Sequence, residues 1–281
     1  MSSCPTSPRL GYLIVGHGTR DLIGQSEFHL AVSRIAELCP SVVVRACFLE
    51  LVEPTISDAI DGLVRDGVER VVVAPLLLFA AGHAKRDVPE AVEAARQRYP
   101  TVSFAQADHL GCHTALLELS ARRFLDAQSL SSTTASLLPH PMGVPNGTLW
   151  VMVGRGSLDA EATAEFERFT QMRRAWTPIA EAWNAYLAMA KPTLREVLAR
   201  AEAAEYARVV VQPHLLFAGE LLVTARELVR ASAERSPDRE WLWAGHLGPA
   251  EQVAAAVVDR CRESELRAWP THDCGGAIGE E

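Results

Sequence analysis

The 281-residue sequence predicts an α/β protein with two similar lobes, each built on a doubly wound parallel sheet, and a cleft between the lobes. Two observations lead to this fold class. Short apolar β-rich runs alternate with longer segments of helical period, and the whole pattern occurs twice along the chain. The alternation is typical of βαβ units, and continuous apolar runs such as Val71–Val73 are typical of strands covered on both faces.

The repeat is visible when the chain is compared with itself. L-I-V-G-H-G-T at 13–19 corresponds to V-M-V-G-R-G-S at 151–157, and V-V-V-A-P-L-L-L-F at 71–79 corresponds to V-V-V-Q-P-H-L-L-F at 209–217, both 138 residues later. Near the end of each copy the triplet H-L-G recurs at a spacing of 137 residues. A spacing this constant indicates two copies of one fold unit, of the flavodoxin or Rossmann type.

Each copy is expected to contain four strands and four helices in alternation. In the first copy we expect strands at 11–15, 42–49, 70–75 and 102–108, and helices at 25–38, 54–65, 84–98 and 111–124. The second copy repeats this order between about residues 149 and 262. The expected organisation is an N-terminal α/β lobe at 1–127, a Ser/Thr/Pro/Gly-rich linker at 128–147, a C-terminal α/β lobe at 148–268 and a loose tail at 269–281.

Composition and charge exclude several classes of protein. The formal net charge of −8 argues against nucleic-acid binding through the phosphate backbone. No stretch stays apolar for the roughly 18 residues that span a bilayer, and residues 1–10 lack the apolar segment of a targeting signal, so we expect a cytoplasmic protein without membrane contact. The six cysteines form no C-x-x-C pair, which argues against structural zinc and iron–sulfur sites.

Three side chains with metal-ligating atoms follow successive strands of the first copy: His17, Glu50 and His83. Because the carboxyl ends of parallel strands lie along one edge of a sheet, we expect these side chains to converge there. Two imidazoles and a carboxylate suit cobalt(II), iron(II), nickel(II) or zinc(II) better than calcium or magnesium. Glu53 lies three residues beyond Glu50 and is an alternative acidic residue.

The second copy provides an internal control for these residues. The positions equivalent to His17, Glu50 and His83 hold Arg155, Ala188 and Leu221, although the surrounding scaffold residues are retained. Histidines required only for packing would leave similar side chains in the copy. The difference therefore favours a functional role for the three residues of the first copy.

Three stretches of the first copy resemble the sirohydrochlorin chelatases, which are class II tetrapyrrole chelatases. The stretches are G-H-G-T-R-D at 16–21, F-L-E-L-V-E-P-T at 48–55 and P-L-L-L-F-A-A-G-H-A-K-R-D-V-P at 75–89. The resemblance implies insertion of Co²⁺ or Fe²⁺, with cobalt favoured, into sirohydrochlorin during cobalamin or sirohaem biosynthesis. It implies His17 and His83 as active-site histidines with Glu50 as their acidic partner, the metal ion as a substrate, and no bound organic cofactor.

A tetrapyrrole with acetate and propionate side chains requires cationic partners at the rim of its site. Four basic residues near strand ends are the candidates: Arg20, Lys85, Arg86 and Arg155. For Lys85 and Arg86 the alternative is a charged first helical turn that is exposed to water. At the position equivalent to His17, which can bind a metal ion, the second copy has Arg155, which can bind a carboxylate. This difference fits a protein in which one lobe binds the ion and the other lobe binds the substrate.

Two other functions fit parts of the sequence. The glycines around His17 are compatible with a phosphate-binding α/β enzyme, although neither G-x-G-x-x-G nor G-x-x-x-x-G-K-[ST] occurs at a strand-to-helix turn. A non-catalytic protein that binds metal or tetrapyrrole is the second alternative. His109 and His246 occur in both copies, so a structural role at a helix start is expected for them, whereas His214 replaces Leu76 and receives no role.

Overall fold

The computed structural model describes residues 8–80, 82, 84–134, 147–177 and 179–270. Within these ranges strands and helices alternate along the chain. The strands are β1 (Leu10–Gly16), β2 (Val43–Phe48), β3 (Arg70–Pro75), β4 (Ser103–Gln106), β5 (Thr148–Gly154), β6 (Glu181–Tyr186), β7 (Arg208–Pro213) and β8 (Glu240–Trp243). The helices are α1 (Leu22–Leu38), α2 (Ile56–Arg65), α3 (Ala84–Arg98), α4 (Thr114–Thr134), α5 (Ala160–Arg174), α6 (Leu194–Ala203), α7 (Glu220–Arg235) and α8 (Glu251–Ala268). In the part of the chain described, none of these helices has the length and apolar character needed to cross a bilayer.

The strands form two four-stranded parallel sheets of the same topology. Their orders are β2-β1-β3-β4 and β6-β5-β7-β8. The registers also correspond, because Gly16 pairs with Phe48 in the first sheet and Gly154 pairs with Tyr186 in the second. The predicted α/β fold with two similar lobes is therefore confirmed, and the strands lie within two residues of their expected bounds.

The central strands are buried on both faces, as their continuous apolar sequence predicts. In β1, Leu13 and Val15 belong to a core cluster with α2 and α3, whereas Tyr12 and Ile14 belong to a cluster on the opposite face. This second cluster continues from one lobe into the other through side chains of α1, α4, α5 and α8. The two lobes therefore share one apolar core in addition to a core of their own.

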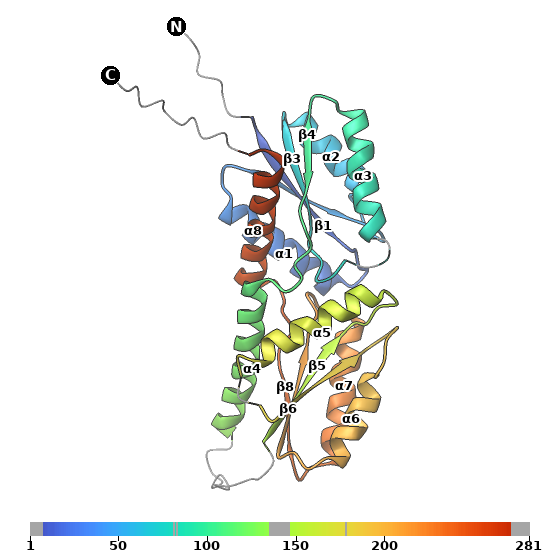
Figure 1. Cartoon of the computed structure of the whole chain (residues 1–281), viewed down its shortest axis with the longest axis vertical. Coiled ribbons are helices and arrows are strands. Elements are labelled where there is room, and N and C mark those ends of the chain that lie inside the picture. The colour runs from blue at the N-terminus through green and yellow to red at the C-terminus, as the bar shows by residue number, and fades with distance from the viewer. Residues whose placement is uncertain (1–7, 81, 83, 135–146, 178, 271–281) are drawn as a thin grey trace, which may run out of the picture.

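The last helix of each copy packs on the sheet of the other copy. Helix α8 lies beside α1 on the first sheet, and α4 lies against β7, β8 and α5 of the second lobe (Figure 1). Ser264 of α8 donates a hydrogen bond to the carbonyl of Gln106 at 3.0 Å, and Gln212 of β7 donates one to the carbonyl of Ser120 in α4 at 2.9 Å. The boundaries 1–127 and 148–268 thus separate the sequence copies but do not coincide with the spatial lobes.

The segments expected to be irregular are partly ordered. Helix α4 continues to Thr134, so the first residues of the expected linker are helical, and 135–146 lie outside the described residues. Trp269, at the start of the expected tail, packs on the core, and the guanidinium of Arg70 lies 5.2 Å from the centre of its ring. Residues 271–281 lie outside the described part of the chain.

Candidate functional site

A cavity of about 970 Å³ lies between the two lobes. It is lined by the loops that follow β1, β2 and β3 of the first lobe and by the loops that follow β5, β6 and β7 of the second. Both sets of loops leave the carboxyl ends of parallel strands, where ligands bind in open α/β sheets. The cavity is large enough for a drug-sized or larger organic ligand.

His17 and Glu50 meet at the wall of this cavity. Nδ1 of His17 lies 3.3 Å from Oε1 of Glu50, without the geometry of a hydrogen bond. The two side chains are 41% and 51% exposed, so a ligand in the cavity can reach both. The convergence of these two residues agrees with the strand-end argument from the sequence.

Gly18 allows the two loops to approach each other. The amide of Glu50 donates to the carbonyl of His17 at 3.1 Å, and the amide of Leu49 donates to the carbonyl of Gly16 at 2.9 Å. Gly18 has a φ of 100°, and a Cβ at this position would lie 1.9 Å from the carbonyl oxygen of Glu50. A side chain here would push Glu50 away from His17.

The acidic alternative, Glu53, lies elsewhere. It is exposed and does not line the cavity, whereas Glu50 does. His83 lies outside the described residues, although its neighbour Gly82 lines the cavity. Across the residues that the structure describes, no three His, Cys, Asp or Glu side chains come close enough to hold a metal ion. The participation of His83 therefore stays a prediction.

The second lobe repeats the loop geometry with different side chains. The amide of Ala188 donates to the carbonyl of Arg155 at 2.8 Å, and a Cβ on Gly156 would lie 1.8 Å from the carbonyl oxygen of Ala188. Arg155 is exposed, lines the cavity and forms no ion pair with any described carboxylate. The position that holds the imidazole of His17 in the first lobe therefore holds, in the second lobe, the guanidinium of Arg155, which has no carboxylate partner among the described residues.

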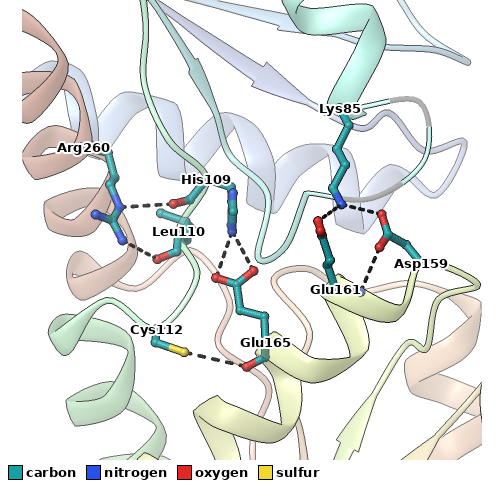
Figure 2. Close-up of polar contacts among 8 residues, drawn as sticks. All are labelled: Lys85, His109, Leu110, Cys112, Asp159, Glu161, Glu165 and Arg260. Atoms are coloured by element: carbon teal, nitrogen blue, oxygen red, sulfur yellow. Dashed lines mark hydrogen bonds and ion pairs between the residues drawn. The ribbon is translucent and has the colours of Figure 1, made fainter.

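The remaining predicted cations lie away from the cavity wall. Arg20 and Arg86 are exposed and do not line the cavity. Nζ of Lys85, at the start of α3, lies 2.6 Å from Asp159 and 2.7 Å from Glu161 of the second lobe (Figure 2). These hydrogen bonds raise the pKa of Lys85 and lower the pKa of Asp159. Lys85 therefore joins the lobes, a role not predicted from the sequence.

Six aromatic side chains that were not predicted from the sequence belong to the lining of the cavity. They form pairs related by the repeat: Phe28 with Phe166, Phe48 with Tyr186, and Phe79 with Phe217. Four of the six rings are buried, and only Phe79 and Phe217 expose part of their surface to a ligand. An apolar wall of this kind suits the face of a flat ring system. Retention of an aromatic residue at both positions of the repeat is the signal that would have identified them.

Most of the chain resembles named chelatases. The CbiX family model matches residues 11–127 and 149–264. The sirohydrochlorin cobaltochelatase of Priestia megaterium is 28% identical over 89% of this chain and 78% of its own length, and the sirohydrochlorin ferrochelatase of the same organism is 28% identical over 86% and 85%. A solved structure of SirB from Bacillus subtilis with Fe³⁺ is 26% identical, covers 91% of this chain and 95% of that one, and has a TM-score of 0.78. One of these two relatives is named for cobalt and the other for iron, and both are 28% identical to this chain. Sequence identity alone therefore does not distinguish cobalt from iron as the metal.

Proposed function

Since this chain belongs to the CbiX family, we propose that it inserts a divalent metal ion, Co²⁺ or Fe²⁺, into the tetrapyrrole sirohydrochlorin. The observation that carries the proposal is the position of His17 and Glu50 on the wall of a large, aromatic-lined cavity between the lobes. The apolar wall, which includes the partly exposed rings of Phe79 and Phe217, suits a face of the macrocycle, and the imidazole and carboxylate suit the ion.

The metal ion enters this reaction as a substrate. Insertion replaces two pyrrole N–H bonds by bonds from the ring nitrogens to the metal, and it releases two protons without any change of oxidation state. No organic cofactor is needed for such a step. The imidazoles of His17 and His83 would hold the ion, and the carboxylate of Glu50 would accept a released proton or complete the ligand set, with the released protons passing on to the solvent.

The second lobe would hold the carboxylates of the substrate. Arg155 is the cation that the structure offers to the cavity without a partner carboxylate among the described residues. Its planar guanidinium can donate two parallel hydrogen bonds to one carboxylate. Arg20 and Arg86 are proposed to contact carboxylates that extend beyond the cavity. Lys85 would contribute only after its present contacts with Asp159 and Glu161 are broken.

The test is an anaerobic absorbance assay of sirohydrochlorin with Co²⁺ and, separately, with Fe²⁺. The wild-type protein should metallate the tetrapyrrole faster than the protein-free reaction, and Glu50→Gln should lose most of this acceleration. Glu53→Gln is the matched control, because Glu53 is exposed and outside the cavity wall, and it should keep the parent rate. Loss in Glu53→Gln with retention in Glu50→Gln would reverse the assignment of the acid. Binding of sirohydrochlorin without acceleration would indicate a carrier instead of an enzyme.

A further inference from the structure

Two large apolar side chains of the second lobe line the cavity and are exposed. Leu158, in the loop after β5, is 85% exposed, and Met189, in the loop after β6, is 59% exposed. Among the described residues that line the cavity, all other large apolar side chains are buried or only partly exposed. Leu158 and Met189 therefore have apolar surface in contact with water that a ligand in the cavity can cover.

The two residues lie on neighbouring loops, close to Arg155. The amide of Ala188 donates to the carbonyl of Arg155 at 2.8 Å, and this hydrogen bond links the two loops. Met189 directly follows Ala188, and Leu158 lies three residues after Arg155. The second lobe therefore brings two exposed apolar side chains and one cation to the same part of the cavity wall.

The first lobe has no such apolar pair in the described cavity wall. The positions equivalent to Leu158 and Met189 hold Arg20 and Leu51, 138 residues earlier. Both are exposed, and neither lines the cavity. Where the first lobe presents an imidazole and a carboxylate, the second lobe thus presents a guanidinium and apolar side chains.

Met189 and Leu51 occupy the same turn of the backbone. The amide of Ala190 donates to the carbonyl of Ala188 at 2.7 Å, and φ of Met189 is 60°, which together define a classic γ-turn. In the first lobe φ of Leu51 is 68°. Bulky side chains strain the backbone in this region, whereas glycine does not. Glycine at either position would keep the turn and remove only the side chain, so the two positions form a matched pair for experiment.

We propose that Leu158 and Met189 pack on the apolar surface of the macrocycle while Arg155 holds one of its carboxylates. The inference rests on the proposed function, since it takes the ligand to be a tetrapyrrole with carboxylate side chains. Covering the exposed surface of the two side chains favours binding through the hydrophobic effect, and the unbranched thioether of Met189 can adapt to the ring. The contact does not involve the ring nitrogens, so it persists when the metal is inserted. Leu158 and Met189 are therefore positioning residues for the substrate.

The first test measures binding in the absence of turnover. Met189→Ala and Leu158→Ala should each raise the Kd of metal-free sirohydrochlorin roughly three- to tenfold, as expected when one large apolar side chain no longer becomes buried on binding. The Kd of cobalt-loaded sirohydrochlorin should rise by the same factor. In the metallation assay the KM should rise, and kcat should stay within about twofold of the parent, because the contact is equal in the ground and transition states.

The dependence on salt separates this contact from that of Arg155. Raising the NaCl concentration from about 0.05 M to about 0.5 M screens interactions between charges. The loss of affinity caused by Met189→Ala should be the same at both concentrations. The loss caused by Arg155→Ala should become smaller at the higher one.

The glycine variants separate the contact from the stability of the protein. Met189→Gly and Leu51→Gly both relieve a positive φ, so the melting temperature of each should rise by about 1–3 °C. Only Met189→Gly should weaken the binding of sirohydrochlorin, because Leu51 does not line the cavity. Met189→Leu keeps an apolar side chain of similar volume and should bind sirohydrochlorin like the parent.

Three outcomes would overturn the role of Leu158 and Met189. They are a parent-like Kd in both alanine variants, equal weakening of binding in Met189→Gly and Leu51→Gly, and a fall in kcat with an unchanged KM in the alanine variants. A wild-type protein that binds sirohydrochlorin but does not accelerate metallation would refute the proposed enzyme activity and leave the binding results valid. A wild-type protein that binds no sirohydrochlorin would refute both.

Discussion

Nε2 of His109 lies 2.8 Å from Oε2 of Glu165, and this contact joins the end of the first sheet to helix α5 of the second lobe (Figure 2). The repeat produces a second contact of the same kind, with Nε2 of His246 3.1 Å from Oε1 of Glu27 in α1. Arg260 of α8 supports the first contact by donating to the carbonyl of His109 at 3.1 Å. His109 and His246, which occupy equivalent positions in the two copies, therefore each form a contact between the lobes.

Glu165→Gln tests whether the contact between His109 and Glu165 stabilises the protein. The substitution keeps the size of the side chain but removes the charge that accepts the imidazole N–H, so the free energy of unfolding should fall by about 1 kcal/mol. Urea denaturation followed by circular dichroism measures the change. Glu27→Gln should have a similar effect, because it alters the equivalent contact. Unchanged stability in both variants would show that these contacts do not hold the lobes together.

Gly18→Ala should damage both stability and activity. The new Cβ would lie 1.9 Å from the carbonyl oxygen of Glu50, and φ at this position is 100°. We expect a loss of at least about 1 kcal/mol in unfolding free energy, and a fall of roughly 100-fold in kcat/KM because Glu50 moves relative to His17.

Gly156→Ala is the matched control that the repeat offers. Its Cβ would lie 1.8 Å from the carbonyl oxygen of Ala188, so the loss of stability should be similar. No proposed metal ligand moves in this variant, so kcat should change little, whereas displacement of the neighbouring Arg155 would raise the KM. Equal losses of kcat in the two alanine variants would contradict the special role of the first lobe.

Arg155→Ala should raise the KM for sirohydrochlorin by roughly tenfold or more, as expected for loss of a hydrogen bond to a charged group. The kcat should change little, because Arg155 is proposed to hold a carboxylate remote from the reacting nitrogens. Steady-state kinetics at saturating Co²⁺ measures both constants. An unchanged KM would remove Arg155 from the substrate site.

Lys85→Met should affect stability more than substrate binding. Lys85 lowers the pKa of Asp159, so the stabilisation from this pair is present above the unfolded pKa of Asp, about 3.9, and is lost as the pH falls through the lower folded value. The raised pKa of Lys85 preserves the stabilisation up to the unfolded pKa of Lys, about 10.4, and it is lost above the folded value.

The melting temperatures of the parent and of Lys85→Met should therefore differ at pH 7 and converge below the pKa of Asp159. Differential scanning calorimetry between pH 2.5 and 8 would follow this convergence. A large rise in KM at pH 7, with no change in melting temperature, would instead support the original expectation that Lys85 binds the substrate.

The sequence predicted the parts of the molecule that follow from local chemistry and from strand direction. The apolar runs predicted the strands. The position of His17 and Glu50 at the carboxyl ends of parallel strands predicted that the two side chains lie close together. The packing of α4 and α8 on the sheet of the other copy was not predicted. The helical period of a sequence identifies an apolar face but not the sheet that this face covers, and the repeat makes the two sheets chemically alike.

The side-chain contacts between the lobes were also not predicted from the sequence. Lys85 was expected to bind substrate because it lies near a strand end, but its partners Asp159 and Glu161 are far away in sequence. A pattern in one sequence does not indicate which distant carboxylate will face a given cation. The same reason explains why His109 and His246 were assigned to helix starts and not to Glu165 and Glu27.

The most direct test of the proposed metal site is the rate of Co²⁺ insertion into sirohydrochlorin by His17→Ala and His83→Ala under anaerobic conditions. At saturating substrate, kcat should fall by roughly 100-fold or more in each variant, as expected for loss of a catalytic imidazole. The affinity for metal-free sirohydrochlorin should stay close to that of the parent. Alanine variants that metallate the substrate as fast as the parent protein would contradict the assignment of the site.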